Sequence, residues 1–508
     1  MLFKTLAEFV DDFCNRHPAA LYAAAVFLGV SASLSPSWAL FFPAVVLFIP
    51  IFFPLIKLRT RIRFFLALAA AIVFFCYCHT YYRLPQLPDE GMRGCYYFRT
   101  CQLEQKQCSF GKQWGFTGSV CSMDGSVQHA PCRISLPMKM ADRSPADSDY
   151  LLQGILYSTR GGRYRLVVDT GIPWEPVEGS FSLAELRFRA KETIAGWIRS
   201  GIANPVSGRF LVGLATGNFD DQLMVHELGR FGLQHIMAIS GFHFAVVAGI
   251  MTFWMQLLLP RRAATLLLIL LLSSYFLFLG PSPSIVRAWI SVSVVLVGMF
   301  IGRAGNGLNT LGVAVLVMML WDPLFSQHIG FLFSVGVTAG ILVFFSLSDR
   351  LLQNVWPVRT LSVMVEMDRF NQHAYCLLHF FRNALALTLA VNVVAFPMSL
   401  YFFHQFSIWG IVYNLFFPFM VTFSMILLLV ALLLPPLAPL FHAINSRYTT
   451  FLLGYVYHAP TSMDLFVKTA SVDPVLLSCY FTCLFFVGLF LAWRQRRERL
   501  ALRELQFV

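Results

Sequence analysis

Charged residues are scarce in this sequence. Only 13% of its 508 residues are Asp, Glu, Lys or Arg, and 57% are hydrophobic. A soluble domain carries about 25% charged residues, so this shortage excludes an ordinary water-soluble globular protein. Apolar runs of about 18 or more residues recur along most of the chain instead, and that length crosses a bilayer as a helix. The sequence predicts a polytopic α-helical membrane protein.

Several motifs of catalysis and nucleotide binding are missing as well. The sequence has no Walker A loop, no HxHxDH metal sequence and no CxxC pattern. His235 and His243 do not have the spacing of an HExxH zinc site, and no nearby carboxylate completes one. We therefore expect no metal, no cofactor and no catalytic residue in this chain.

The basic residues are unevenly placed. The formal net charge is +12, yet most of the excess lies in links between apolar runs and at the C-terminus. This is the positive-inside pattern of membrane proteins, and it requires no anionic ligand. The densest link, Lys57–Arg63, and the basic tail from Arg494 are accordingly placed in the cytoplasm, together with both chain ends.

Composition divides the chain into five parts. The apolar runs give about 11 to 12 membrane spans, depending on whether 440–457 crosses the bilayer. The predicted parts are an N-terminal three-helix membrane region (1–82), an extracytoplasmic β-rich domain (83–180), interfacial amphipathic helices with a re-entrant segment (181–230), the main transmembrane domain (231–493) and a basic cytoplasmic tail (494–508).

The polar segment after the third apolar run has strand and turn signals. Tyr150–Tyr157 and Tyr164–Val168 are β-rich, and Thr159–Gly162 between them is typical of a hairpin turn. An extracytoplasmic location would permit disulfides, although their connectivity cannot be derived from the sequence. The candidate disulfide residues are Cys95, Cys101, Cys108, Cys121 and Cys132.

The stretch Phe231–His243 carries polar residues where a membrane helix usually has Leu or Val. On an unbroken helix, His235, Ser240 and His243 would share one side, with Gly232 beside them. Polar side chains inside a bilayer need partners or water. Something other than lipid should therefore face this stripe.

Two interpretations of this stripe stay open. In one, the histidines make hydrogen bonds between packed helices. In the other, Ser240 and His243, which are neighbours at i and i+3, form a hydrolase dyad. No orienting acid is visible in the spans, so the first interpretation is preferred. Gly241, like Gly232, would leave a gap in the bulk of the helix.

Polar residues recur at the outer ends of other predicted spans. A shared depth is not expected of scattered structural polar residues, so these residues are candidates for lining one hydrated entrance. They are Pro281, Ser282, Ser284 and Arg287 in one segment, Gly330 and Ser334 after His328 in the next, and Gln405, Ser407, Asn414 and Pro418 in a third.

Arg287 is the most unusual of these residues because it stands inside a predicted span. It could extend to the outer lipid headgroups, or it could line a hydrated path and meet an anion. A guanidinium suits phosphate, and both alternatives stay open from the residues alone.

The motifs taken together resemble the ComEC/Rec2 family of competence proteins. The resemblance rests on Gly232–His243, on Gly280–Ala288 with Arg303 closing that span, on Asp322-Pro323 and Gly330–Ser334, and on Phe396-Pro397 with Gln405, Ser407, Asn414 and Pro418. It covers about residues 205–435 at motif level. One departure is Leu332, where family members usually carry Gln.

The resemblance implies an inner-membrane channel that imports single-stranded transforming DNA. It also implies an external OB-like domain, contact with membrane lipid, a DNA-receptor protein outside and an ATP-dependent motor inside. Many members end in a metallo-β-lactamase-like domain, and no HxHxDH sequence is present here, so strand degradation is expected from another protein or not at all. An intramembrane Ser/His hydrolase acting on lipid or peptide is the alternative, and the oligomeric state is left open.

Overall fold

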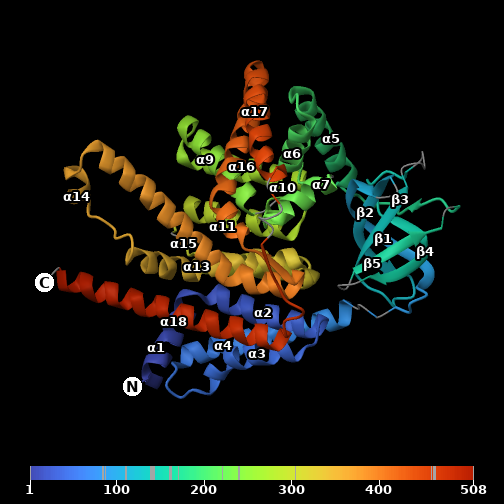
Figure 1. Cartoon of the computed structure of the whole chain (residues 1–508). Helices are drawn as coiled ribbons and strands as arrows, with labels where there is room; N and C mark the ends of the chain where they lie inside the picture. The colour runs from blue at the N-terminus through green and yellow to red at the C-terminus, as the bar shows by residue number, and fades with distance from the viewer. Residues whose placement is uncertain are drawn as a thin grey trace.

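The structure, a computed structural model, describes most of the chain. The sequence positions it describes are 2–82, 85, 87–108, 111–137, 143–159, 163–169, 171–219, 221–237, 241–303, 305–458, 460 and 465–506. Within them the chain forms a helical bundle and a small β-barrel that packs against one end of it (Figure 1). We call the end of the bundle that contacts the β-barrel the barrel end. Both chain termini lie at the opposite, far end.

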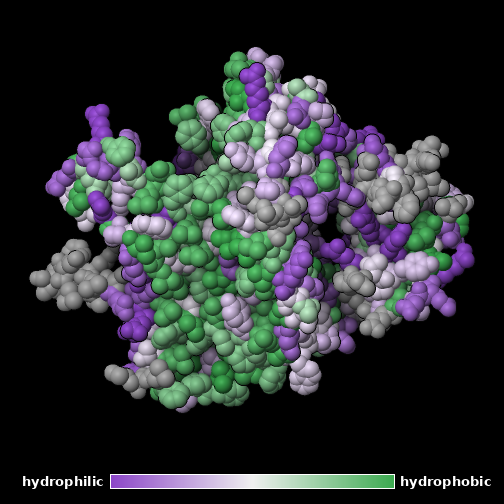
Figure 2. Space-filling view, viewed as in Figure 1, coloured by the Kyte–Doolittle hydropathy of each residue, from purple (hydrophilic) through white to green (hydrophobic). Residues whose placement is uncertain are grey.

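The bundle has an apolar surface. Eight of its helices, among the described residues, are long and apolar enough to cross a membrane, and a ninth span arises if α1 and α2, bent by 93°, count as one. Figure 2 shows hydrophobic residues over the bundle and hydrophilic ones toward the barrel and the far end. The helices are α1 (Leu2–Arg16), α2 (Pro18–Leu34), α3 (Phe41–Phe48), α4 (Leu58–Tyr81), α5 (Ala184–Gly201), α6 (Pro205–Thr216), α7 (Gln222–Arg230), α8 (Gln234–Met237), α9 (Gly241–Leu258), α10 (Arg261–Leu279), α11 (Pro283–Phe300), α12 (Gly307–Trp321), α13 (Ile329–Gln353), α14 (Leu361–Glu366), α15 (Arg369–Phe403), α16 (Trp409–Leu433), α17 (Ala438–Tyr457) and α18 (Pro474–Gln506), with short 3-10 turns at Trp38–Leu40, Ile49–Phe52, Pro323–Gln327 and Pro435–Leu437.

The chain is thus a multi-pass membrane protein with a β-rich domain, as the sequence predicts. The described residues supply fewer spanning helices than the predicted 11 to 12. The apolar run 38–56 becomes a short helix over Trp38–Phe52, and α12 is only 15 residues long. A count of 11 to 12 spans requires these shorter helices and α17 to cross the membrane as well.

The end of α17 is fixed by a small two-stranded sheet. β7 (Gln405–Ser407) directly precedes α16, and β8 (Phe466–Lys468) lies between α17 and α18. The two strands pair antiparallel, with Gln405 opposite Lys468. Because of this pairing, α16 and α17 form a hairpin that returns to the end from which it began. The predicted alternation of spans across the membrane requires residues 440–457 to run in this direction. α17 is not among the eight helices that are long and apolar enough to cross a membrane.

The β-rich domain is a closed five-stranded barrel. Its order is β1-β2-β3-β5-β4, closed by β1 pairing with β4, and β3 and β5 run parallel. Alternating residues fill the interior, including Phe98, Phe116 and Leu156, all fully buried. This is the strand order of an OB fold. The strands are β1 (Met92–Cys108), β2 (Gly111–Ser122), β3 (Ala130–Pro137), β4 (Tyr150–Thr159), β5 (Arg163–Val168) and the edge strand β6 (Glu175–Pro176).

The predicted hairpin between the two β-rich runs is present, since β4 and β5 pair antiparallel up to Thr159 and Arg163. Its turn residues, 160–162, lie outside the described part of the chain. The predicted disulfides are absent from the structure: Cys95, Cys101, Cys121 and Cys132 are free, and the side chain of Cys108 is not described. The register explains this, because Cys121 faces Tyr97 and Cys132 faces Gly118 and Tyr164 rather than another cysteine.

Helix α5 joins the barrel to the bundle. Its Glu185 accepts two hydrogen bonds from the Arg143 guanidinium, at 2.8 and 2.9 Å. These bonds outweigh burial and hold the pKa of Glu185 at about 2, with help from the Ala146 amide. Arg143 also lies over the Trp114 ring at 4.8 Å. Farther along α5, Arg187 donates to the carbonyl of Leu277 on α10 at 2.8 Å, so the barrel is tied to a spanning helix.

Candidate functional site

Three spanning helices meet at Arg287. Arg287 lies on α11, and its Nε donates a hydrogen bond to Ser334 Oγ on α13 at 2.7 Å. A Cβ added to Gly241, the first residue of α9, would lie 2.3 Å from Arg287 Nη2. The guanidinium therefore occupies space that only a glycine leaves open. We call Gly241, Arg287 and Ser334 the Arg287 cluster.

The local sequence explains how Arg287 comes to this place. Gly280 ends α10 with φ +99, a conformation that L residues rarely adopt. Pro283 then occupies the first turn of α11, where the missing N–H of proline is tolerated. Ser284 Oγ donates to the carbonyl of Gly330 at 3.5 Å, linking the first turns of α11 and α13. Arg287 and Ser334 follow one turn deeper on their respective helices.

Arg287 has no ion pair with a carboxylate in the part of the chain that the structure describes. A charged side chain in a membrane helix normally pairs or faces water. The cluster is thus a cationic point among spanning helices, and its guanidinium has N–H donors that Ser334 does not use. Such a point can attract an anion.

The histidine before α13 connects this region to the barrel. His328 Nδ1 accepts the backbone N–H of Gly330 at 3.1 Å, which caps α13. Its Nε2 lies 3.4 Å from an Nη of Arg163 on β5. Sequence reasoning places His328 at an outer turn but misses Arg163. The two residues are 165 positions apart, and no spacing rule connects them.

A second group of the predicted residues packs elsewhere. Gly232 has φ +66, and a Cβ there would lie 3.3 Å from the Cα of Gly410 on α16. Ser407 Oγ donates to the carbonyl of Arg230 at 3.0 Å. The segment leading into α9 is therefore anchored to the start of α16, and Gly232 and Ser407 belong to this anchor rather than to the Arg287 cluster.

The two histidines of the polar stretch have different surroundings. His235 on α8 is exposed, and its Nδ1 lies 3.2 Å from the carbonyl of Gly232. His243 on α9 is only 2% exposed. The prediction of one stripe facing a common medium is wrong for this pair. Ser240 lies outside the described residues, and so does any geometry between it and His243.

The remaining predicted residues lie apart from the cluster. Pro281 and Ser282 form the turn before α11, and Gln405 is exposed on β7. Asn414 Oδ1 is buried without a hydrogen-bond partner among the described residues. Pro418, inside α16, has no N–H to offer the Asn414 carbonyl one turn earlier. Within the described chain, no hydrogen bond or ion pair joins Gln405, Asn414 or Pro418 to Arg287.

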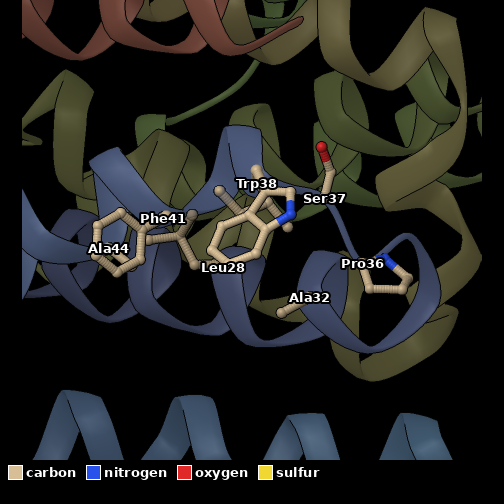
Figure 3. A pocket seen from close by; sticks show the side chains of 8 residues that line it. Leu28, Ala32, Pro36, Ser37, Trp38, Phe41 and Ala44 are labelled. Carbon is tan, nitrogen blue, oxygen red and sulfur yellow. The ribbon is translucent and has the colours of Figure 1, made fainter.

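Two apolar hollows lie elsewhere in the bundle. One, of about 470 Å³, is lined by residues of α2 and the segment after it, and Figure 3 shows Leu28, Trp38 and Phe41 beside it. The other, of about 520 Å³, lies between α5, α6, α9, α10 and α16. Neither is lined by a charged residue, so neither suits an anion as the Arg287 cluster does.

The cluster falls inside a stretch with known relatives. Residues 218–497, more than half of the chain, match the family model described as "Competence protein". The chain belongs to the competence protein family. Gly241, Arg287 and Ser334 all lie within the matched stretch.

A curated relative supports this membership. This competence protein is 22% identical over 264 residues to "ComE operon protein 3" of Bacillus subtilis (strain 168), an alignment that covers 51% of this chain and 30% of that relative. The match thus spans less than a third of the relative's length. No solved structure matches the chain.

Proposed function

We propose that this competence protein forms a channel in the inner membrane through which single-stranded DNA enters the cytoplasm during natural transformation. Residues 231–493 would form the channel domain, and the barrel within 83–180 would stand outside the membrane. Family membership and the multi-pass fold support a role in DNA uptake. The observation that carries the finer proposal is Arg287, a cation among spanning helices with no acidic partner among the described residues.

The physical chemistry of strand passage fits this site. A nucleotide chain needs a hydrated path and a few cations that attract phosphates without trapping them. An arginine costs about 2.5–3.5 kcal/mol at the centre of a membrane helix and less toward its end. Arg287, near the start of α11, bears part of this cost, which favours a role that repays it. Gly241 leaves the room in which the guanidinium lies, and Ser334 fixes the direction of the guanidinium.

The basic residues support an orientation of the protein in the membrane. The Lys57–Arg63 link leads into α4, and Arg494 to Arg497 lie on the final part of α18, toward the far end. By the positive-inside rule the far end would be cytoplasmic. The barrel end then receives DNA from an external receptor protein, and an ATP-dependent motor would act at the far end.

The test is transformation with chromosomal variants in a naturally competent host. Arg287→Gln should lower the delivery of labelled single strands to the cytoplasm by about 10- to 100-fold, since a hydrogen bond to a charged group contributes about 1.5–3 kcal/mol. Binding of duplex DNA at the cell surface should stay normal. Arg262→Gln, which removes an exposed arginine at the start of α10, is the matched control. Normal strand delivery by a membrane-inserted Arg287→Gln protein would contradict the proposal.

Ser240→Ala separates the channel from the hydrolase alternative. A channel should tolerate this change, because the lost hydroxyl is a minor part of the wall. A nucleophilic serine could not be replaced, so complete loss of function with normal protein levels would favour the enzyme.

A further inference from the structure

The barrel carries arginines on one outward face. In the parallel pair of β3 and β5, Arg133 stands directly beside Arg165. Their neighbours on both strands, Cys132, Ile134 and Leu166, are buried inside the barrel, so the alternation of a strand turns the arginines outward. Arg163 lies two residues before Arg165 and shares its face. We call Arg133, Arg163 and Arg165 the arginine face.

These arginines are unlike the others of the barrel. Arg93 pairs with Asp169 at 3.0 Å, and Arg143 pairs with Glu185 at 2.8 Å. Within the described residues, no member of the arginine face has a carboxylate partner. Adjacent strands are about 4.8 Å apart, and like charges at paired positions destabilise a sheet. An anion bound across Arg133 and Arg165 would remove that repulsion.

The sheet leaves room for these side chains. A Cβ at Gly115 on β2 would lie 3.0 Å from Arg133 Nη2, so the guanidinium lies across a position without a side chain. Arg133 Nε is buried without an acceptor in the described part of the chain. On the other side, Tyr157 of β4 is paired with Arg165. The face therefore combines cations with an aromatic ring, as surfaces for single strands do.

The arginine face ends at the bundle. Arg163 Nη2 lies 3.4 Å from His328 Nε2. His328 uses Nδ1 to accept the Gly330 amide, so a neutral ring carries its proton on Nε2. Burial, followed by the charge of Arg163, lowers the pKa of His328 and keeps the ring neutral. Two donors thus face each other, and a shared acceptor such as a phosphate oxygen would satisfy both.

We propose that Arg133, Arg165 and Arg163 bind successive phosphates of a single-stranded nucleic acid and lead it to His328, at the entrance beside the Arg287 cluster. This proposal rests on the proposed function. A chain of phosphates fits better than one lipid headgroup, because the cations are spread over two strands and reach the bundle at Arg163. Ser284, which bonds to the Gly330 carbonyl, continues the line toward Arg287.

The experiment measures binding of a fluorescent oligothymidylate to the full chain in nanodiscs of neutral lipid, over a range of salt concentrations. The Arg133→Gln/Arg165→Gln double variant should weaken binding and reduce the slope of log K against log salt by about 1.4, since each phosphate contact on a single strand contributes about 0.7. Arg93→Gln, which removes a paired arginine of the same barrel, is the control and should leave the slope unchanged. An unchanged slope in the double variant would overturn the inference.

Two further measurements separate this result from the proposed function. Arg287→Gln should bind the oligonucleotide at the arginine face and still fail to deliver strands in cells. If the double variant binds normally while Arg287→Gln blocks delivery, the channel stands and the arginine face is wrong. If the double variant loses binding to anionic vesicles but keeps the oligonucleotide, the face binds lipid, which also overturns the inference. Thermal unfolding of each variant identifies loss of folding.

Discussion

Two arginines in the spanning helices of this protein have opposite surroundings. Arg382 on α15 is 3% exposed, and its Nε donates to Asp349 on α13 at 3.1 Å. It also donates to the Trp356 carbonyl at 3.1 Å and lies 3.0 Å from His379. Arg287 on α11 has one hydrogen bond, to Ser334, and no acidic partner among the described residues.

The difference separates a structural charge from a functional one. Each nitrogen of the Arg382 guanidinium has a protein partner, so the side chain holds α13 against α15. Within the described part of the chain, the Arg287 guanidinium has N–H donors without a protein acceptor, and it lies in the room that Gly241 leaves. Removing the ion pair of Arg382 should destabilise the fold, whereas replacing Arg287 should preserve the fold and stop transport.

The largest effect is expected from Asp349→Asn. Removing one partner of a buried ion pair leaves the other charge uncompensated and costs about 3–5 kcal/mol. The free energy of unfolding of the solubilised protein should fall by that amount, and transformation should fall only with protein level. Arg350→Gln, at the neighbouring position of α13, should change stability little. An Asp349→Asn protein as stable as the unchanged protein would contradict the structural role of the Arg382–Asp349 ion pair.

Arg287→Leu should have the reverse effect on stability. Replacing an unpaired charge by an apolar residue in a membrane helix should raise the free energy of unfolding, by up to about 3 kcal/mol. Strand delivery should nevertheless be lost. Thermal unfolding and delivery are measured on the same variant. A loss of stability comparable to that of Asp349→Asn would show that Arg287 is a structural residue.

Ser334→Ala tests the one hydrogen bond that Arg287 makes within the described residues. Loss of a bond to a charged group should weaken strand delivery by an amount equivalent to about 1.5–3 kcal/mol. Thr338→Val is the matched control on α13, because the Thr338 hydroxyl donates to a backbone carbonyl, that of Ser334, at 2.7 Å and not to Arg287 among the described residues. Equal effects of the two substitutions on strand delivery would show that Ser334 does not act in the site.

Gly241→Ala is expected to have the smallest effect on stability, about 1 kcal/mol or less, because the end of a flexible arginine can move aside. Delivery should still fall, since the added methyl group displaces the guanidinium. Gly249→Ala on the same helix meets no atom within 4 Å and is the control. In the double variant with Arg287→Gln, the Gly241 substitution should add nothing. Additive effects would show that the two residues act separately.

Several of these features can be predicted from the amino-acid sequence. Low charge and long apolar runs predict the membrane bundle, and β-rich runs with a turn predict a β domain. Arg287 and Gly241 stand out because each is unusual inside an apolar run. The shared stripe of His235 and His243 is wrong, because it depends on an unbroken helix and on exposure. The four described cysteines of the predicted pool are free, because strand register decides which residues face each other.

The sequence alone determined the class of this protein, its family and the polar residues that a lipid environment does not explain, since these follow from composition and local order. Only the tertiary structure decided which of them act together. Gly241 meets Arg287, Arg382 finds Asp349, and Arg163 of the barrel reaches His328. The physical reason is that the energy and the role of a charged side chain depend on the groups that surround it in space. Those neighbours are brought together by helix packing and barrel closure across long separations in the chain.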